Sequence, residues 1–333
     1  MQSFSVATFN TLDFFDDKPP HVIAGLDRDG WSPERQADAT RFYRRKLNVI
    51  ARILTRLDAD IVVLQEVKGN TVLEQLRQRL APRYLATGDE QYGGYHRPIS
   101  ARPGRRGIAV GVLTRWPILE ATEHSPDELP FPIFLEGDPH PFAGRLRLHR
   151  PMLELILERP DGGKLALIGI HLKSHLPLPL VDASGDSKRI TSLDERAQAY
   201  ARSFVSRLAE ALFVRRRVSD LLKQGLPVIV AGDFNDQPDA ASLRIIAGDI
   251  GAPTDLADPE RLLNCMRAVP SHKRYSTTHN GERRLIDHVM VSSSLWQSLR
   301  RVDIFHDEID MTPASEFNPA SDHAPLRVEF SGW

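Results

Sequence analysis

The sequence has few of the features that mark specialised protein classes. Its one cysteine, Cys265, cannot form an internal disulfide, which excludes a disulfide-stapled scaffold. No apolar run approaches the ~18 residues of a membrane-spanning helix. The first residues have neither the basic nor the long apolar region of a signal peptide. We therefore expect a cytoplasmic protein with no stable membrane association, and the sequence indicates no obligate protein partner.

Neither sign of charge dominates the sequence. The 43 Lys and Arg residues almost balance the 44 Asp and Glu residues, and the formal net charge is −1. The chain has no overall basic field that would attract nucleic acid, so any polyanion must be held locally. Hydrophobic residues make up 41% and charged residues 26% of the chain, which is typical of a globular protein and excludes a disordered or collagen-like one.

Short apolar runs that predict β-strands recur along the whole chain and alternate with helical patterns. The runs cover residues 4–9, 61–64, 108–113, 152–157, 165–170, 228–231, 285–291 and 326–330. No Gly/Ser-rich linker and no internal repeat divides them. We therefore expect one α/β domain that spans residues 1–333.

Apolar residues at helical spacing predict three helices. The first has an apolar face made of Leu47, Ile50, Leu54 and Leu57. The second follows Asn70, a candidate N-cap. The third begins at a capping box of Ser192 and Glu195 and ends near Gly225. Its expected apolar stripe consists of Tyr200, Phe204, Leu208, Leu212, Val218 and Leu222. The basic run at residues 41–46 is interpreted as a solvent-exposed helix face.

Three stretches fit no regular element and are expected to be insertions: residues 16–38, 123–150 and 174–191. Loops of this length in a compact domain are either functional or simple surface excursions. The most apolar part of them is LPFPIFL, at residues 129–135. This segment would contact a membrane in a lipid hydrolase, but we expect it to be buried in the core.

Polar side chains with useful chemistry follow several of the predicted strands, and function tends to gather at such strand ends. Because side chains alternate along a strand, Asn10 continues the face of Phe4 and Val6, and Glu66 continues the face of Val62 and Leu64. Each of the two polar residues therefore extends a buried face.

The segment LPVIVAGDFNDQPD is the strongest single motif. Gly232 allows a close approach of the backbone, and Asp233 and Asn235 lie two residues apart, so both can face one site. A carboxylate beside an amide can hold a water molecule and a phosphoryl oxygen together. An Asx-turn that merely closes the strand is the structural alternative.

Imidazole groups follow two other strands. His171 and Lys173 share a face at the end of the strand at residues 165–170, and an imidazole is the natural proton donor near neutral pH. His288 must point away from its neighbour Asp287 if their strand is regular, and we expect Asp287 to face inward.

Asp322 and His323 precede the last strand in irregular backbone, so both can turn toward one site. An aspartate beside His323 would orient its ring and favour the imidazolium.

The acidic and amide side chains of these segments are oxygen ligands of the kind that Mg²⁺ or Mn²⁺ prefers. With one cysteine in the chain, a thiolate zinc cluster is excluded. The sequence has neither a GxxxxGK[ST] loop nor a Rossmann fingerprint, so it indicates no nucleotide cofactor. A magnesium-dependent phosphoryl-transfer site is the simplest interpretation.

Together these segments resemble the endonuclease/exonuclease/phosphatase superfamily, which includes pancreatic-type deoxyribonuclease, abasic-site endonucleases, sphingomyelinases and inositol polyphosphate 5-phosphatases. The similar segments are TFNTLDFF, LQEV, GIAVGVLTRWP, IGIHLKS, AGDFNDQPD, LIDHVMVSS and SDHAPL, which span nearly the whole chain. The resemblance implies an α/β fold, a four-layer α/β/β/α sandwich of two packed mixed β-sheets flanked by helices, with the site at one rim.

The resemblance also implies roles for single residues. Glu66 would be the principal metal ligand, with Asn10 and Asp322 nearby. Asp233 and Asn235 would position the attacking water. The proton of that water would pass either to Asp233 or to a pair formed by an aspartate and a histidine, because accounts of the family differ on this step.

That pair would be Asp287 and His323, with His323 in contact with the scissile phosphate, and His171 would assist the phosphate or the leaving group. Relatives with an HLKS segment often have RGIDVALL in the preceding strand, whereas this chain has Ala109 in place of the acid that could orient His171. Lys173, Arg105 and Arg106 remain as candidate phosphate contacts.

The residues and the resemblance together predict a Mg²⁺-dependent phosphodiesterase that attacks phosphorus with an activated water. A nucleic acid, DNA or RNA, is the leading substrate, although the near-neutral charge does not favour it. One alternative is a phosphomonoesterase or a lipid- or inositol-phosphate hydrolase that uses the same site. Another is a non-catalytic module that binds phosphate or a protein partner.

Overall fold

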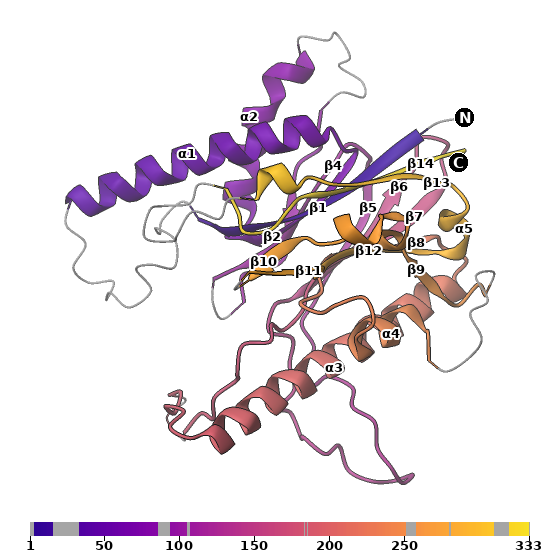
Figure 1. The fold of residues 1–333 in the computed structure, drawn as a ribbon. Coiled ribbons are helices and arrows are strands. Elements are labelled where there is room, and N and C mark those ends of the chain that lie inside the picture. The colour runs from indigo at the N-terminus through magenta and orange to yellow at the C-terminus, as the bar shows by residue number, and fades with distance from the viewer. Residues whose placement is uncertain are drawn as a thin grey trace.

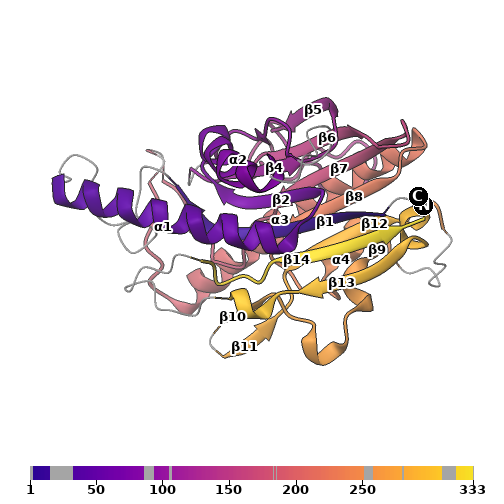
Figure 2. The same cartoon turned by 90° about the horizontal axis from the view of Figure 1, so that it is seen from above.

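Two six-stranded β-sheets pack face to face in the computed structural model, with helices on both outer faces (Figures 1 and 2). The structure describes residues 3–15, 33–85, 94–104, 107–182, 184, 186–250, 258–279, 281–309 and 320–332. The strand order is β13-β14-β1-β2-β4-β3 in the first sheet and β5-β6-β7-β8-β12-β9 in the second. The expected four-layer α/β/β/α sandwich is therefore confirmed.

The first sheet has one parallel pair, β1 with β2, and is otherwise antiparallel. Its strands are β1 (Ser3–Phe14), β2 (Ile61–Val67), β3 (Ile99–Ser100), β4 (Ala109–Thr114), β13 (Leu299–Ile304) and β14 (Leu326–Ser331). Helices α1 (Pro33–Leu57) and α2 (Asn70–Leu85) cover its outer face (Figure 1). The two chain ends lie side by side, because β1 and β14 pair in antiparallel fashion from Ser3 and Ser331 onward.

The second sheet has one parallel pair, β7 with β8. Its strands are β5 (Ile118–His124), β6 (Met152–Glu158), β7 (Lys164–His171), β8 (Val228–Asp233), β9 (Leu262–Asn264) and β12 (Asp287–Ser292). Helices α3 (Leu193–Lys223) and α4 (Ala241–Ala247) cover its outer face (Figure 1). The short helix α5 (Ser293–Trp296) and the hairpin of β10 (Thr277–His279) and β11 (Glu282–Arg284) complete the named elements used below.

The core between the sheets is built by alternation along each strand. The inward residues form one cluster that joins both sheets, with Val6 and Val63 from the first and Leu167, Ala231 and Val289 from the second. The residues between them face outward, where they pack against the helices. This regular alternation decides which polar residue at a strand end faces the inter-sheet space.

All eight predicted strands are present, but the sequence analysis did not predict β3, β5, β9, β10, β11 and β13. The burial pattern of β5 is mostly exposed, so its sequence shows no apolar run. Asn70 is the first residue of α2 and not its N-cap. Its Oδ1 accepts a hydrogen bond from the backbone N–H of Ser100, which ties the helix to β3.

Helix α3 begins at the predicted capping box of Ser192 and Glu195. Its expected apolar stripe is confirmed at Val218 and Leu222, which pack in the core, but is wrong in its first half. Tyr200 and Phe204 are exposed, and the buried face instead carries small and charged side chains. The buried residues are Ala199, Ser203, Ser206, Arg207, Ala209, Glu210, Ala211, Val214, Val218 and Leu221. The buried charges are retained because they have partners in neighbouring loops.

Two of the three expected insertions lie against α3. Of the third, residues 16–32 fall outside the described residues, and the prediction is wrong for residues 33–38, which form the start of α1. In the 123–150 stretch, Leu129 packs near Ala209 of α3. The predicted burial of the segment at residues 129–135 is wrong for its second half, because Phe134 is 99% exposed and Leu135 is 68% exposed. The tip of this insertion is therefore exposed and not part of the core.

None of the described helices is long and apolar enough to cross a membrane.

A buried charge cluster links β6 to α3 and yields a first prediction. Glu154 accepts hydrogen bonds from Arg217 and lies 3.0 Å from the ring of His124. Burial alone would raise the pKa of Glu154, but these hydrogen bonds and the charge of Arg217 outweigh it and lower the pKa to about 2. Glu154→Gln should therefore lower the free energy of unfolding at pH 7, by about 1–2 kcal/mol.

The sign of the pH dependence follows from the lowered pKa. The stabilisation is complete above the ordinary pKa of a glutamate and disappears as the pH falls toward about 2. Urea unfolding of Glu154→Gln and the unaltered protein should give curves that converge between pH 5 and pH 3. If the difference in the free energy of unfolding between the two proteins were the same at pH 5 and pH 3, this account would be contradicted.

Candidate active site

Three functional side chains lie in one row across the second sheet. The register pairs His171 of β7 with Asp233 of β8, and Asp233 with Asp287 of β12. All three follow the inward positions of their strands, as alternation predicts, and all three are buried. His288 points to the outer side, where it packs against Phe234. An imidazole and two carboxylates are thus placed at one edge of the inter-sheet space.

The first sheet contributes residues from the opposite side of that space. Asn10 Nδ2 donates a hydrogen bond of 3.0 Å to Asp233 Oδ2. The Nε2 atom of His171 lies 3.4 Å from the same oxygen and 3.9 Å from Glu66 Oε1. The structure therefore brings Asn10, Glu66, His171 and Asp233 together, although 223 positions separate the first from the last.

Glu66 reaches the site by a route that the sequence analysis did not predict. Val62 and Leu64 face the helices, so a regular strand would also turn Glu66 toward them. The strand is instead irregular between Gln65 and Val67, and Glu66 has a φ of 61°. Its Oε2 accepts a hydrogen bond from the backbone N–H of Asp13. The bulge re-aims the carboxylate, a role that bulges beside functional sites often have.

Asp287 and His323 form a buried pair. His323 Nδ1 lies 2.7 Å from Asp287 Oδ2. Burial alone would lower the pKa of His323, but the charge and hydrogen bond of Asp287, with smaller contributions from Asp322 and Asp233, raise it well above the ordinary value. The pair therefore favours the imidazolium form of His323, with its ring orientation fixed by Asp287.

The segment that carries His323 is tied to the rest of the site by buried polar side chains. Ser321 Oγ donates to the backbone carbonyl of Asn10 and accepts from the N–H of His323. Lys46 Nζ donates to the carbonyl of Ala320. Lys46 is 1% exposed, so its assignment to a solvent-exposed helix face is wrong. The helical spacing of the basic run carries no information about a hydrogen-bond partner as distant in sequence as Ala320.

Asp233 and Asn235 sit in a tight turn after β8. The backbone N–H of Asn235 donates to Asp233 Oδ1, and its side chain donates to the carbonyl of Leu172. Gly232 precedes them with a φ of 151°, and a Cβ there would lie 2.0 Å from the carbonyl oxygen of Ile170. The close backbone approach predicted for this glycine is therefore confirmed.

The environment of Asp233 alters its acidity. Burial and the nearby negative charge of Asp287 raise the pKa of Asp233 to about 7, although His323 and the hydrogen bonds from Asn235 and Asn10 act in the opposite direction. A carboxylate with such a pKa can accept a proton near neutral pH, which is the property of a general base.

The oxygen atoms around the site suit a divalent cation. One oxygen each of Asp233 and Asp287 and a ring nitrogen of His323 lie within 4.8 Å of one another. Among the described residues, Asp287 Oδ1 and Asp322 Oδ1 are buried without a hydrogen-bond partner. Buried carboxylate oxygens that lack donors fit a cation or its bound water. Asp322 Oδ1 lies 3.9 Å from His323 Nε2, beside the other acids.

The remaining candidate residues are Lys173, Arg105 and Arg106, the predicted phosphate contacts. Lys173 is buried, and its Nζ donates to the carbonyls of Ser174 and Leu176, so it holds the turn that follows β7. Arg105 and Arg106 lie outside the described residues.

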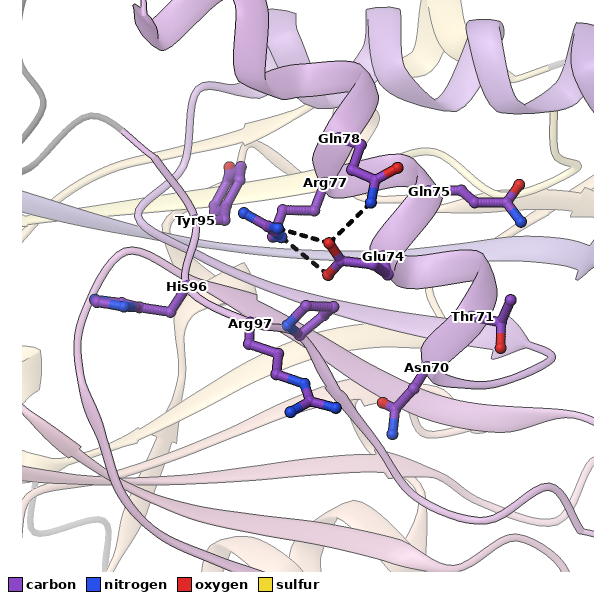
Figure 3. Close-up of a pocket in the computed structure, with 10 residues that line it drawn as sticks. Asn70, Thr71, Glu74, Gln75, Arg77, Gln78, Tyr95, His96 and Arg97 are labelled. Atoms are coloured by element: carbon purple, nitrogen blue, oxygen red, sulfur yellow. Dashed lines mark hydrogen bonds and ion pairs between the residues drawn. The ribbon is translucent and has the colours of Figure 1, made fainter.

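A separate surface pocket lies beside α2 (Figure 3). Asn70, Glu74, His96 and Arg97 are among its lining residues. Glu74 is paired with Arg77, so the pocket has little free negative charge. None of the candidate catalytic or metal-binding residues lines this pocket.

Comparisons with known proteins agree with this geometry. A family model described as "Endonuclease/Exonuclease/phosphatase family" matches residues 8–323. A mannosyl-6-phosphatase from Bacteroides thetaiotaomicron has a similar structure, with 17% identity, a TM-score of 0.56 and coverage of 99% of this chain and 100% of that one. A comparison with curated proteins found no match.

Two other solved structures are similar over nearly their whole length. The human Nocturnin catalytic domain with bound sulfate anion has 15% identity, a TM-score of 0.54 and coverage of 99% of this chain and 94% of that one. A truncated Caenorhabditis elegans TDP2 has 16% identity, a TM-score of 0.51 and coverage of 99% and 98%. At these identities the likeness concerns the fold.

Proposed function

Because the chain belongs to the Endonuclease/Exonuclease/phosphatase family, we propose that it is a metal-dependent phosphodiesterase and that a nucleic acid is its leading substrate. The observation that carries the proposal is the row of His171, Asp233 and Asp287 facing Asn10 and Glu66 from the other sheet. This set combines a base, an acid and oxygen ligands in one buried place. We also propose that residues 1–333 act as one catalytic domain.

The proposed reaction is an attack of water on phosphorus. Asp233 accepts the proton of that water, and Asn235 helps to hold the water and a phosphoryl oxygen. The imidazolium of His323, held by Asp287, stabilises the negative charge that develops on the phosphoryl oxygens, and His171 assists at the phosphate or the leaving group. Lys173, Arg105 and Arg106 are the proposed additional phosphate contacts.

Asn10, Glu66 and Asp322 are the residues that would hold Mg²⁺ or Mn²⁺. When bound, such an ion neutralises phosphate charge and polarises the phosphoryl group. The Oδ1 atom of Asp322 supports this assignment, because it is buried and none of the described residues gives it a hydrogen bond.

Exposed apolar side chains favour a second candidate, a hydrolase of lipid-like phosphoesters. Phe134 and Leu135 at the tip of one insertion and Leu176 and Leu180 in the other are exposed. The second insertion begins directly after Lys173, three residues beyond the end of β7. An apolar surface this near to the site would suit a substrate with a hydrocarbon part.

A non-catalytic binding module is the third alternative. It would not need Asp233 at a pKa near neutrality, nor an imidazolium held by a buried acid. Retention of every acid and both histidines therefore supports an enzyme.

Removal of metal tests the proposal. The purified protein should hydrolyse bis-p-nitrophenyl phosphate with Mg²⁺ or Mn²⁺, and chelation should lower the rate by about 100-fold or more. Readdition of the ion should restore it. A rate that chelation does not change, or no turnover with either ion, would reject the metal-dependent phosphodiesterase.

A substrate panel then separates the candidates. Single-stranded DNA, duplex DNA, RNA, inositol phosphates, a phosphomonoester and sphingomyelin in vesicles should be compared at equal metal concentration. The leading proposal requires the highest kcat/KM with one of the nucleic acids. The highest kcat/KM with sphingomyelin vesicles would instead support the lipid hydrolase.

A further inference from the structure

The buried face of α3 carries two charges that contact the loops of the active site. Arg207 and Glu210 are one helical turn apart, and their side chains are 2% and 1% exposed. Burying a charge in a helix–sheet interface is costly unless partners compensate it. The partners of Arg207 and Glu210 therefore indicate what these two buried charges do.

Glu210 holds the turn after β7 from one side. One of its oxygens accepts the backbone N–H of Lys173 at 2.6 Å. The other accepts the backbone N–H of His149 and lies 3.1 Å from the ring of that histidine. Burial alone would raise the pKa of Glu210, but these groups lower it. The carboxylate is therefore ionised and fixed.

Arg207 holds the same turn from the other side and also reaches the loop after β8. Its Nη1 donates to the carbonyl of Lys173 at 3.0 Å, and its Nε donates to Asp236 Oδ2 at 2.9 Å. Its Nη2 lies 3.3 Å from His175 Nδ1. Asp236 is held further by the hydroxyl of Ser242. One guanidinium thus bridges the two loops just beyond the last backbone hydrogen bond between them, which runs from the N–H of Leu172 to the carbonyl of Asp233.

These two loops carry catalytic groups. Lys173 lies two residues after His171, and Asp236 lies directly after Asn235. Asn235 also donates across the same gap to the carbonyl of Leu172. The ladder of β7 and β8 already holds His171 beside Asp233, so the groups that Arg207 fixes are those just beyond the ladder, Lys173 on one side and the turn of Asn235 on the other.

We propose that Arg207 is a positioning residue, which holds the turn after β7 and the loop of Asn235 at the separation that water attack requires. The proposal rests on the proposed phosphodiesterase function. A planar guanidinium offers donors in a fixed fork and so serves the carbonyl and the carboxylate at once, which a lysine ammonium on a flexible stem does not.

A second pair on the same helix provides a matched control. Arg217 lies ten positions further along α3 and binds a carboxylate of the same sheet, that of Glu154. Its contacts are with β6 and with Asp220, away from the catalytic loops. A purely structural role predicts the same consequences for Arg207→Met and Arg217→Met.

The experiment compares kcat, KM and Tm for these variants and for Arg207→Lys. We expect Arg207→Met to lower kcat by about 10–100-fold with little change in KM, since small misplacements of reacting groups have effects of this size. Arg207→Lys should recover only part of the rate, and Arg217→Met should lower Tm but leave kcat within about twofold. Equal kcat for Arg207→Met and Arg217→Met would overturn the proposal.

Two further measurements keep the result decisive. In an Asn235→Ala background, Arg207→Met should lower kcat by less than about threefold, because the group it positions is gone. If Arg207→Met does not fold, Arg207→Lys carries the test, and a kcat equal to that of the unaltered protein overturns the proposal.

Failure of the proposed function is distinguished by a readout without turnover. Hydrogen exchange at the amide of Lys173, bonded to Glu210, should be faster in Arg207→Met and unchanged in Arg217→Met. No turnover by the unaltered protein would reject the phosphodiesterase. Unchanged exchange and unchanged kcat in Arg207→Met would reject only the role of Arg207.

Discussion

Asp233→Asn is expected to lower kcat by about 10³–10⁴-fold and, at the same time, to raise Tm. The loss of rate follows because an amide cannot accept the proton of the attacking water. The hydrogen bond from the backbone N–H of Asn235 to the side-chain oxygen can persist in the variant, so the turn should keep its conformation. Steady-state kinetics and a thermal melt of the same preparation test both effects.

The gain in stability follows from the raised pKa of Asp233. The pKa of Asp233 is about 7 in the folded protein and lower in the unfolded chain. In the pH window between these two pKa values, the folded state therefore binds more protons than the unfolded chain. Stability is therefore lost as the pH rises through the window, and the neutral amide avoids this loss. In metal-free buffer the Tm difference between Asp233→Asn and the unaltered protein should be larger at pH 8 than at pH 5.

Two outcomes would contradict this account of Asp233. A variant that retains a tenth or more of the rate would show that Asp233 is not the base. A Tm of Asp233→Asn below that of the unaltered protein at pH 8 would show that the buried carboxylate stabilises the fold. Asn10→Ala is the control, because it also loses a hydrogen bond to this position.

The activity of the unaltered protein should rise with pH along its acidic limb, because Asp233 must be ionised to accept a proton. A bound divalent cation favours the carboxylate and lowers its pKa. The limb should therefore lie below pH 7 with saturating Mg²⁺.

Alternation along strands explains why much of the site could be predicted from sequence. Asn10, His171 and Asp233 follow inward-facing apolar residues at even spacing, and Asp287 precedes such residues, so each continues a face that the core already orients. Parallel pairing of β7 with β8 and antiparallel pairing of β8 with β12 then bring three of these residues into one row. The pairing itself was not predicted, since the resemblance implied only the sandwich fold and a common site at one rim.

Local backbone irregularity and long-range partners explain what the sequence could not predict. The same alternation would turn Glu66 toward the helices, and only the bulge with its positive φ brings the carboxylate to the site. Lys46 was assigned to an exposed helix face and Arg207 was not singled out, because helical spacing gives no information about the carbonyls they bind in distant segments. Phe134 looked like a core residue, because hydrophobicity alone does not tell how far a loop extends from the core.

His323→Ala is expected to lower kcat by about 10³-fold, and Asp287→Asn should lower it less, by about 10²-fold at pH 8. The alanine removes the cation that faces the phosphate, whereas the asparagine keeps the ring in place and removes only the charge that supports it. The double variant should be no slower than His323→Ala, because the two residues act as one unit. Additive losses would mean that Asp287 has a separate role.

The pH profile of Asp287→Asn gives the sharper test of this pair. The negative charge of Asp287 raises the pKa of His323 and also that of Asp233. Its removal should lower both pKa values, so the acidic and the alkaline limbs should both move to lower pH. Activity then falls earlier as the pH rises, because the imidazolium of His323 is lost sooner. An alkaline limb that stays in place in Asp287→Asn would show that His323 does not act as the cation of this reaction.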